Sequence, residues 1–312
     1  MREFKIDFNK ALKPVLIVYA AIFIIGIVFS VIWGVDLDIN FSGGTKISYS
    51  YTGDIAEDDI KTVVDEHVDK KYTLGKSTAL AGDTQTFEIS LVGKDSLSAE
   101  TQEALTAALT EKFGDNEIQL YNSNSVSPTI AGSFFLKSLV AVLITAVLVV
   151  IYVGIRFKRI GGVSAAVTAL CALVLDILVT FFTCVIFRLQ IDSNYIAVVL
   201  TILGYSLNDT IVIYDRVREN ERFNPDMETG DLVNMSVNKV MVRNIVTTVT
   251  TVLAVLTIVV VSELFGLSSL RTFAIPMAFG LLSGAISSLF VSGPLWVIWK
   301  RHKAAKAATA KK

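Results

Sequence analysis

The 312-residue chain has few of the residues that build disulfide-stapled, zinc-binding or histidine-based sites. It contains two cysteines, Cys171 and Cys184, and two histidines. Both cysteines lie in one apolar run, so the acidic segment described below has none and a disulfide framework is excluded there. A Cys/His zinc site is not expected either, and the thiols are predicted to fill a helix interface as small apolar groups. No cofactor or metal is predicted.

The chain also lacks a basic stripe beside a soluble fold, which is the footprint of nucleic-acid binding. Its residues are 53% hydrophobic, and the mean hydropathy is +0.59, which is too apolar for an ordinary soluble domain. Residues 36–131 hold 17 Asp and Glu against 7 Lys and Arg, a net charge of −10, whereas the rest of the chain has a net charge of +9. This asymmetry predicts one acidic soluble domain on a membrane body that has a basic side.

Six apolar runs are long enough for transmembrane helices. Each can cross roughly 30 Å of hydrocarbon at about 1.5 Å per residue. The first run is too long for the core of a signal peptide and is predicted to be an uncleaved span. The six runs are Pro14–Trp33, Ser138–Ile155, Gly162–Phe187, Tyr195–Tyr214, Ile245–Val261 and Phe273–Trp299.

Basic residues predict the orientation of these spans. Opposite the basic side, the short loops hold only Arg188 and Arg271, so the positive-inside rule places both termini in the cytoplasm and the acidic domain outside. The predicted boundaries are 1–13 for a cytoplasmic N-terminus, 14–34 for the first span and 35–132 for the outer domain. Residues 133–299 hold the other five spans, with a cytoplasmic loop at 215–242, and residues 300–312 form a basic cytoplasmic tail. The basic side carries Arg2, Lys5, Lys10, Lys13, Arg156, Lys158, Arg159, Arg216, Arg218, Arg222, Lys239, Lys300, Arg301 and Lys303.

The pattern of the acidic segment predicts a compact α+β domain. Ile47, Tyr49 and Tyr51 alternate with serines, which predicts a half-buried strand. Apolar residues then recur at helical spacing over 60–68 and 105–113, with Ser98 as a candidate cap of the second helix. Further strands are predicted near 72–80, 84–92 and 117–122. The resulting order βαββαβ predicts a ferredoxin-like domain between the first two spans.

The membrane body contains two acids that are costly in lipid. Asp176 lies about 17 Å and Asp209 about 21 Å from the outer ends of their helices, so the two can share a layer. An ionised carboxylate at that depth costs several kcal/mol, so the protonated form of Asp209 is favoured. If water reaches Asp209 from each side in turn, the residue becomes a proton carrier. An intramembrane acid is a functional hypothesis by default.

The fifth predicted span offers partners for Asp209. On this span, the depth of Asp209 in the membrane corresponds to about Thr247. Arg243 lies one turn shallower on the same helical face. Together with Asn208, these residues predict a proton relay. Close helix packing is predicted at the small residues Gly204, Gly280, Gly284 and Ser288, the last three of which stand four apart.

The segment Gly204–Asn220, GYSLNDTIVIYDRVREN, closely resembles the fourth-span signature of the SecF family of protein-export membrane subunits. The resemblance covers essentially the whole chain, and the fourth-span motif is highly specific. It continues in Phe41–Gly44, Val126–Pro128, Arg156–Phe157, Arg243–Thr247, Gly280, Gly284, Ser287, Ser288 and Gly293–Leu295.

This resemblance implies a half-bundle similar to the RND superfamily, in a multi-pass protein of the bacterial inner membrane. It implies pairing with a SecD subunit, association with the SecYEG channel and action on translocating polypeptide within membrane lipid. The energy source would be a proton or sodium gradient, with no enzymatic activity. Asp209 matches the family's intramembrane carboxylate, and Arg243 and Thr247 match its fifth-span partners. Asp176 belongs to the predicted proton or ion coupling set together with Asp209, Asn208, Arg243 and Thr247. Leu175 stands where members often carry histidine before the acid, so the alternative for Asp176 is a structural acid hydrogen-bonded to a neighbouring helix.

Three alternatives remain open from the residues. An RND-type proton-driven small-molecule or lipid exporter half would need an apolar pocket in the outer domain. An intramembrane aspartyl protease built on Asp176 and Asp209 has suitable chemistry, but the Gly-x-Gly-Asp arrangement is missing because Ser206 stands two before Asn208. A non-transducing scaffold predicts that Asp209→Asn is silent.

Overall fold

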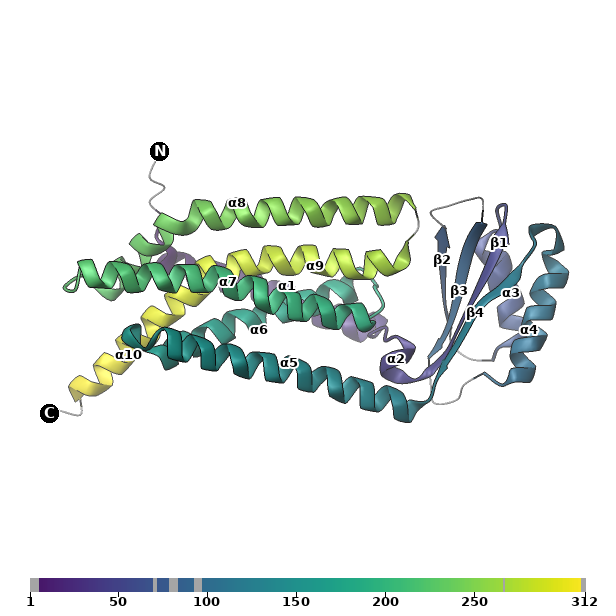
Figure 1. The fold of residues 1–312 in the computed structure, drawn as a ribbon, viewed down its shortest axis with the longest axis horizontal. Helices are drawn as coiled ribbons and strands as arrows, with labels where there is room; N and C mark the ends of the chain where they lie inside the picture. The colour runs from purple at the N-terminus through teal and green to yellow at the C-terminus, as the bar shows by residue number, and fades with distance from the viewer. Residues whose placement is uncertain (1–5, 70–71, 79–83, 93–96, 266, 310–312) are drawn as a thin grey trace.

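A computed structural model of the chain describes residues 6–69, 72–78, 84–92, 97–265 and 267–309. It consists of a long helix bundle with a small α+β domain at one end (Figure 1). Both ends of the chain lie at the opposite end of the bundle from this domain. The basic residues Arg2 and Lys5 and the last two positions of the strand expected at 72–80 lie outside the described residues.

Six helical segments in the described residues are long and apolar enough to cross a membrane. Relative to the apolar runs, α7 and α8 continue for several turns at the end of the bundle that carries the termini (Figure 1). The sixth segment contains a π-helical turn, η3. The segments are α1 (Phe8–Trp33), α5 (Pro128–Arg156), α6 (Gly162–Ile186), α7 (Ser193–Phe223), α8 (Thr229–Leu264), and α9 (Ser268–Ser287) continued by η3 (Ser288–Ser292) and α10 (Gly293–Thr309).

The helix ends follow local capping chemistry. The side chain of Asp7 accepts a hydrogen bond from the backbone N–H of Lys10, and Ser127 accepts one from Ile130. Gly34 ends α1 with a φ of 78°, a backbone conformation that glycine adopts without steric cost. A 3₁₀ turn, η2 (Lys158–Ile160), separates α5 from α6.

Helix α6 is the centre of the bundle and packs against α1, α5, α7 and α9. Its contact with α1 is close because Gly26 has no side chain: a Cβ there would lie 2.2 Å from Cδ1 of Phe182. The main core cluster lies toward the termini and includes Phe157, Tyr214 and Trp296, all fully buried. Helices α1 and α5 instead expose many large apolar side chains, as expected for surfaces that face lipid.

The small domain has the element order β1–α3–β2–β3–α4–β4. Its four strands form one antiparallel sheet in the order β2-β3-β1-β4. A short helix, α2 (Ile39–Ser42), joins α1 to the sheet, and a 3₁₀ turn, η1 (Gly114–Asn116), follows α4. The bounds are β1 (Gly44–Thr52), α3 (Glu57–His67), β2 (Tyr72–Thr78), β3 (Thr84–Val92), α4 (Ala99–Lys112) and β4 (Gln119–Val126).

The alternation along β1 produces the core of this domain. Ile47, Tyr49 and Tyr51 are buried and pair across the sheet with β3, where Phe87 lies opposite Tyr49. Apolar faces of α3 and α4 cover the same side of the sheet. Ser98 caps α4 by accepting a hydrogen bond from the N–H of Thr101, as the sequence predicts.

The two glycines before β1 are required by the backbone. Gly43 and Gly44 have φ angles of 79° and 137°, which favour glycine. A Cβ at Gly44 would also lie 2.0 Å from the carbonyl oxygen of Leu91. These residues therefore form the tight turn that leads the chain from the bundle into the sheet.

Candidate functional site

Asp176 lies in the middle of α6 and is fully buried. Three serine hydroxyls from two other helices donate hydrogen bonds to its carboxylate. Ser283 donates to Oδ1 at 2.6 Å, and Ser206 and Ser287 donate to Oδ2 at 2.7 and 2.9 Å. Both carboxylate oxygens therefore have partners, and the buried acid is held by α7 and α9.

This cluster extends to the first helix. The hydroxyl of Tyr19 on α1 lies 3.1 Å from the carbonyl oxygen and 3.0 Å from Oγ of Ser283. Tyr19 is itself 4% exposed, which places this contact away from the lipid face of α1. Asp176 is thus the centre of a polar network that joins four helices, a role that the sequence did not define.

Asp209 lies one helical turn after Ser206 on α7 and is 3% exposed. Its Oδ2 is buried and has no hydrogen-bond partner in the described part of the chain. An unpaired polar group in an apolar interior costs free energy that a partnered one does not. Asp209 is therefore nearly as buried as Asp176 but lacks the hydrogen-bond partners that Asp176 has.

The predicted partners of Asp209 do not all converge on it. Thr247 lies at the contact of α7 with α8, where its carbonyl oxygen accepts a hydrogen bond of 3.0 Å from Tyr205. Its hydroxyl donates to the carbonyl of Arg243 on its own helix at 2.8 Å. Arg243 and Asn208 have exposed side chains. The structure, which describes both partners, shows no ion pair between Arg243 and Asp209, although the guanidinium lies close enough for its charge to act on that carboxylate.

Two further buried polar residues lie next to the predicted ones. Asn244 and Thr248 on α8 are 2% and 3% exposed, and Nδ2 of Asn244 and Oγ1 of Thr248 have no partner among the described residues. Their signal in the sequence is a polar i, i+4 pair at the start of an apolar span. The adjacent pair formed by Arg243 and Thr247 carries the same spacing, so sequence alone does not choose between the two faces.

The small residues predicted for packing divide into two groups. A Cβ at Gly280 would lie 2.1 Å from Cδ1 of Ile202, and one at Gly284 would lie 3.0 Å from Cβ of Ser206. Ser288 donates a 3.1 Å hydrogen bond to the carbonyl of Ser206. Gly204, in contrast, lies on an exposed face of α7, and a Cβ there would meet no atom within 4 Å.

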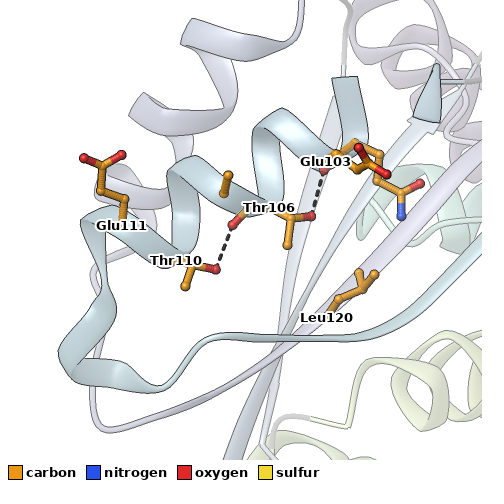
Figure 2. Close-up of a pocket in the computed structure, with 7 residues that line it drawn as sticks. Glu103, Thr106, Thr110, Glu111 and Leu120 are labelled. Carbon is orange, nitrogen blue, oxygen red and sulfur yellow. Dashed lines mark hydrogen bonds between the residues drawn. The ribbon is translucent and has the colours of Figure 1, made fainter. Parts of the chain in front are cut away.

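The small α+β domain carries a shallow open hollow beside α4 (Figure 2). Apart from Leu120 of β4, all the residues that line it come from α4. The hydroxyls of Thr106 and Thr110 already donate to carbonyls of their own helix, as Figure 2 shows. The polar groups that the hollow presents are chiefly the exposed carboxylates of Glu103 and Glu111. Its lining consists of Gln102, Glu103, Thr106, Ala107, Thr110, Glu111 and Leu120.

Comparison with known proteins places this arrangement in a family. The family model for protein export membrane protein SecD/SecF, C-terminal, matches residues 105–302. The chain belongs to the SecD/SecF family. The protein translocase subunit SecF of Alicyclobacillus acidocaldarius is 30% identical over 310 residues, which cover 99% of this chain and 97% of that relative. The protein translocase subunit SecDF of Bacillus subtilis is 33% identical over 312 residues, covering 97% of this chain and 39% of that relative.

Solved structures of SecDF have the same fold. The crystal structure of SecDF from Thermus thermophilus, a translocon-associated membrane protein, matches with a TM-score of 0.78 and 26% identity over 95% of this chain. SecDF in its super-membrane-facing form matches with a TM-score of 0.69 over 98% of the chain. The chain spans 39% and 40% of these two SecDF chains. It is therefore a multi-pass membrane protein with a SecDF-like membrane fold, whose relatives are protein translocase subunits.

Proposed function

We propose that the chain is the SecF-type subunit of a protein translocase and that it couples an ion gradient to the export of secretory polypeptides. Membership of the SecD/SecF family supports the first part. The single observation that carries the second is Asp209, a buried acid in a membrane helix with one carboxylate oxygen left without a partner in the described residues. Burying an ionisable group in a membrane span costs free energy, so such residues are rare and are taken as functional candidates by default.

The proposed cycle alternates the protonation of Asp209. Its protonated form is compatible with the apolar surroundings, and its ionised form attracts Arg243 across the contact of α7 with α8. A charge that crosses the whole membrane potential gains about 2.3 kcal/mol per 100 mV. That is comparable with the few kcal/mol that separate two conformations of a protein. Thr247 and Asn208 complete the proposed coupling set, and Asp176 holds α6, α7 and α9 together.

The proposed topology places both termini in the cytoplasm and the acidic domain outside. In this arrangement residues 35–132 are the outer domain, and 14–34 and 133–299 are the membrane part. The sheet order β2-β3-β1-β4 and the two helices on one face support a ferredoxin-like domain. A SecD subunit would complete the bundle, and the SecYEG channel would deliver the client polypeptide to the outer side.

The test is export by inverted membrane vesicles that contain SecYEG, SecD and this chain. Translocation of a secretory polypeptide is measured as protease protection under a proton gradient alone, a sodium gradient alone and neither. Asp209→Asn is expected to lower export to the rate measured without a gradient, since the variant cannot change its charge. Co-purification of SecD is expected to be unchanged.

The matched control is Asp226→Asn, which removes a carboxyl group from the exposed turn between α7 and α8. This variant is expected to respond to the gradient like the unmodified chain. If Asp209→Asn keeps gradient-dependent export while deletion of the whole chain abolishes it, the protein is a scaffold and the coupling role is wrong.

A further inference from the structure

Three buried polar atoms without a partner in the described residues belong to α7 and α8, two helices that pack on each other. They are Oδ2 of Asp209, Nδ2 of Asn244 and Oγ1 of Thr248. They make up half of the six such atoms in the described part of the chain. The three residues are at most 3% exposed, so bulk water does not solvate these groups.

Hydrogen bonds define the register of α7 against α8. The hydroxyl of Tyr205 lies 3.0 Å from the carbonyl oxygen of Thr247 and 2.8 Å from Oγ1 of Thr251. Toward the other end of the contact, Asn220 donates to Ser236 at 2.8 Å. The two helices run antiparallel, so moving along α7 toward its C-terminus corresponds to moving along α8 toward its N-terminus. Residue 209 therefore lies opposite about residue 246 of α8.

Asp209 is that position. Asn244 and Thr248 are one turn apart on one face of α8, so they lie about 3 Å on either side of its level. All three side chains are buried inside the bundle, where α8 packs on both α7 and α9, rather than exposed on its surface. The antiparallel register therefore gathers the three unpartnered atoms at one depth of the bundle.

The three groups match the hydrogen-bonding capacity of one water molecule. The amide Nδ2 of Asn244 donates to the water oxygen, the carboxylate Oδ2 of Asp209 accepts from the water, and the hydroxyl of Thr248 can do either. Buried waters typically make about three hydrogen bonds to buried polar groups that would otherwise lack a partner. A sodium ion requires oxygen ligands, so it would fit only after the amide of Asn244 had turned its oxygen inward.

We infer that Asp209, Asn244 and Thr248 bind one internal water molecule, and that this water passes protons to the carboxylate of Asp209. The inference rests on the proposed coupling role of Asp209 and adds Asn244 and Thr248 as positioning residues. When a hydrated proton reaches the site, its O–H bond breaks as the bond from Oδ2 to hydrogen forms. A neutral water is left between the amide and the hydroxyl.

Other charged groups facing this position are few. Asp176 on α6 is bound by three serine hydroxyls, whereas Arg243 on α8 is exposed but lies close enough for its positive charge to act on the carboxylate of Asp209. Between Gly280 and Gly293 the sixth span has no charged residue. The carboxylate of Asp209 is thus the proton acceptor at this depth, and the inferred water is the group that delivers the proton to it.

The test uses the full chain in complex with SecD, reconstituted in lipid and studied by infrared difference spectroscopy during a pH step. Exchange of ordinary water for H₂¹⁸O is expected to shift one O–H stretching band of a strongly held water. That band is expected to disappear in Asn244→Leu and in Thr248→Val. The control Thr250→Val changes an exposed hydroxyl that donates to its own helix, and it is expected to keep the band.

Transport provides the second measurement. Asn244→Leu is expected to lower proton-driven export about tenfold, the factor that one lost hydrogen-bond partner of a buried group typically makes. Asn244→Gln restores the amide and is expected to recover part of the rate. A band that persists in Asn244→Leu overturns the inference, as does a difference spectrum that appears on adding sodium at constant pH, which would make the site a cation site.

These outcomes separate the two proposals. If Asp209→Asn loses gradient-driven export but Asn244→Leu keeps both export and the water band, only the water site is wrong. If Asp209→Asn itself exports normally, the coupling role fails, whatever the spectra of the α8 variants show.

Discussion

Asp176 and Asp209 are buried aspartates on adjacent helices of one apolar bundle, yet their surroundings differ. Three hydroxyls bind the carboxylate of Asp176, whereas Oδ2 of Asp209 has no partner in the described residues. Ser206 lies on the same helix as Asp209, one turn away, and donates its hydrogen bond to Asp176. Burial is therefore shared by both acids, and the hydrogen-bond partners are what distinguish a structural acid from a candidate switch.

The two acids also contact different parts of the bundle. Asp176 connects α6 to α7 and α9 and, through Ser283 and Tyr19, to α1. Asp209 lies close enough to α8 to feel the charge of Arg243, and α8 packs on α7 and α9 while exposing much of its remaining surface. A change of charge at Asp209 would therefore act on α8 relative to a group of helices that Asp176 holds fixed.

The largest expected effect on stability separates the two acids directly. Asp176→Ala is expected to lower the free energy of unfolding by about 3 kcal/mol, because three buried serine hydroxyls lose their acceptor. Asp209→Ala is expected to change it by less than about 1 kcal/mol, since Oδ2 accepts no hydrogen bond from the described residues and only its contact with the inferred water is lost. Unfolding of the purified chain in mixed micelles, followed by circular dichroism, measures both.

Asp176→Asn is the matched control for this comparison. It keeps one carbonyl acceptor at nearly the same volume. Its free energy of unfolding should therefore fall between those of the unmodified chain and of Asp176→Ala. Equal losses for Asp176→Ala and Asp209→Ala would show that the two acids do not differ as the hydrogen bonds indicate.

The sequence predicts those features that depend on local periodicity. Six apolar runs correspond to six long helices, and alternation over 84–92 matches the bounds of β3. The starts of helices are harder to predict: α8 begins at Thr229, 16 residues before the apolar run. The intervening turns are amphipathic and bury Leu232 and Val237 in the core. Local hydropathy does not predict where such a helix begins, because its first turns are stabilised by packing against the rest of the bundle.

The candidate site is less predictable because it depends on the rotation of each helix. Asp176 and Asp209 stand out as acids in apolar runs, but the serines that bind Asp176 come from positions 30 to 111 residues away. Thr247 and Thr248 cannot be told apart from the sequence. They differ in burial because neighbouring residues on a helix face different sides. Only the packed bundle separates the exposed Arg243 from the buried Asn244.

Two glycines provide a comparison with a smaller expected effect. Gly280→Ala is expected to lower the free energy of unfolding by about 1–2 kcal/mol, because the new methyl would lie 2.6 Å from Oγ1 of Thr180 as well as against Ile202. Gly204→Ala meets no atom within 4 Å and is expected to be neutral or to stabilise α7 by about 0.5 kcal/mol. Thermal unfolding of each variant in detergent measures the difference. A larger loss for Gly204→Ala than for Gly280→Ala, measured without SecD, would contradict this packing.

The smallest expected effect concerns an acid outside the membrane-spanning helices. Asp192 caps α7 by accepting hydrogen bonds from the backbone N–H of Asn194 at 2.9 Å and of Tyr195 at 3.3 Å, and Thr272 donates to its other oxygen at 3.1 Å. Asp192→Ala is expected to cost about 1 kcal/mol, the usual value of an N-cap. Asp192→Asn can keep the cap and is expected to cost less. Both are measured by thermal unfolding at constant pH.

The stability of the unmodified chain relative to Asp192→Asn is expected to depend on pH in a defined direction. Burial raises the pKa of Asp192 above its usual value, although hydrogen bonds from Thr272 and from backbone amides oppose the shift. The folded state therefore binds a proton more tightly than the unfolded state, and its stability falls as pH rises from the ordinary carboxyl pKa to the raised one. Asp192→Asn cannot titrate, so the melting temperature of the unmodified chain should decrease relative to this variant as pH rises from about 4. A difference in melting temperature that stays constant, or changes in the opposite direction, would show that the hydrogen bonds outweigh the burial of this carboxyl group.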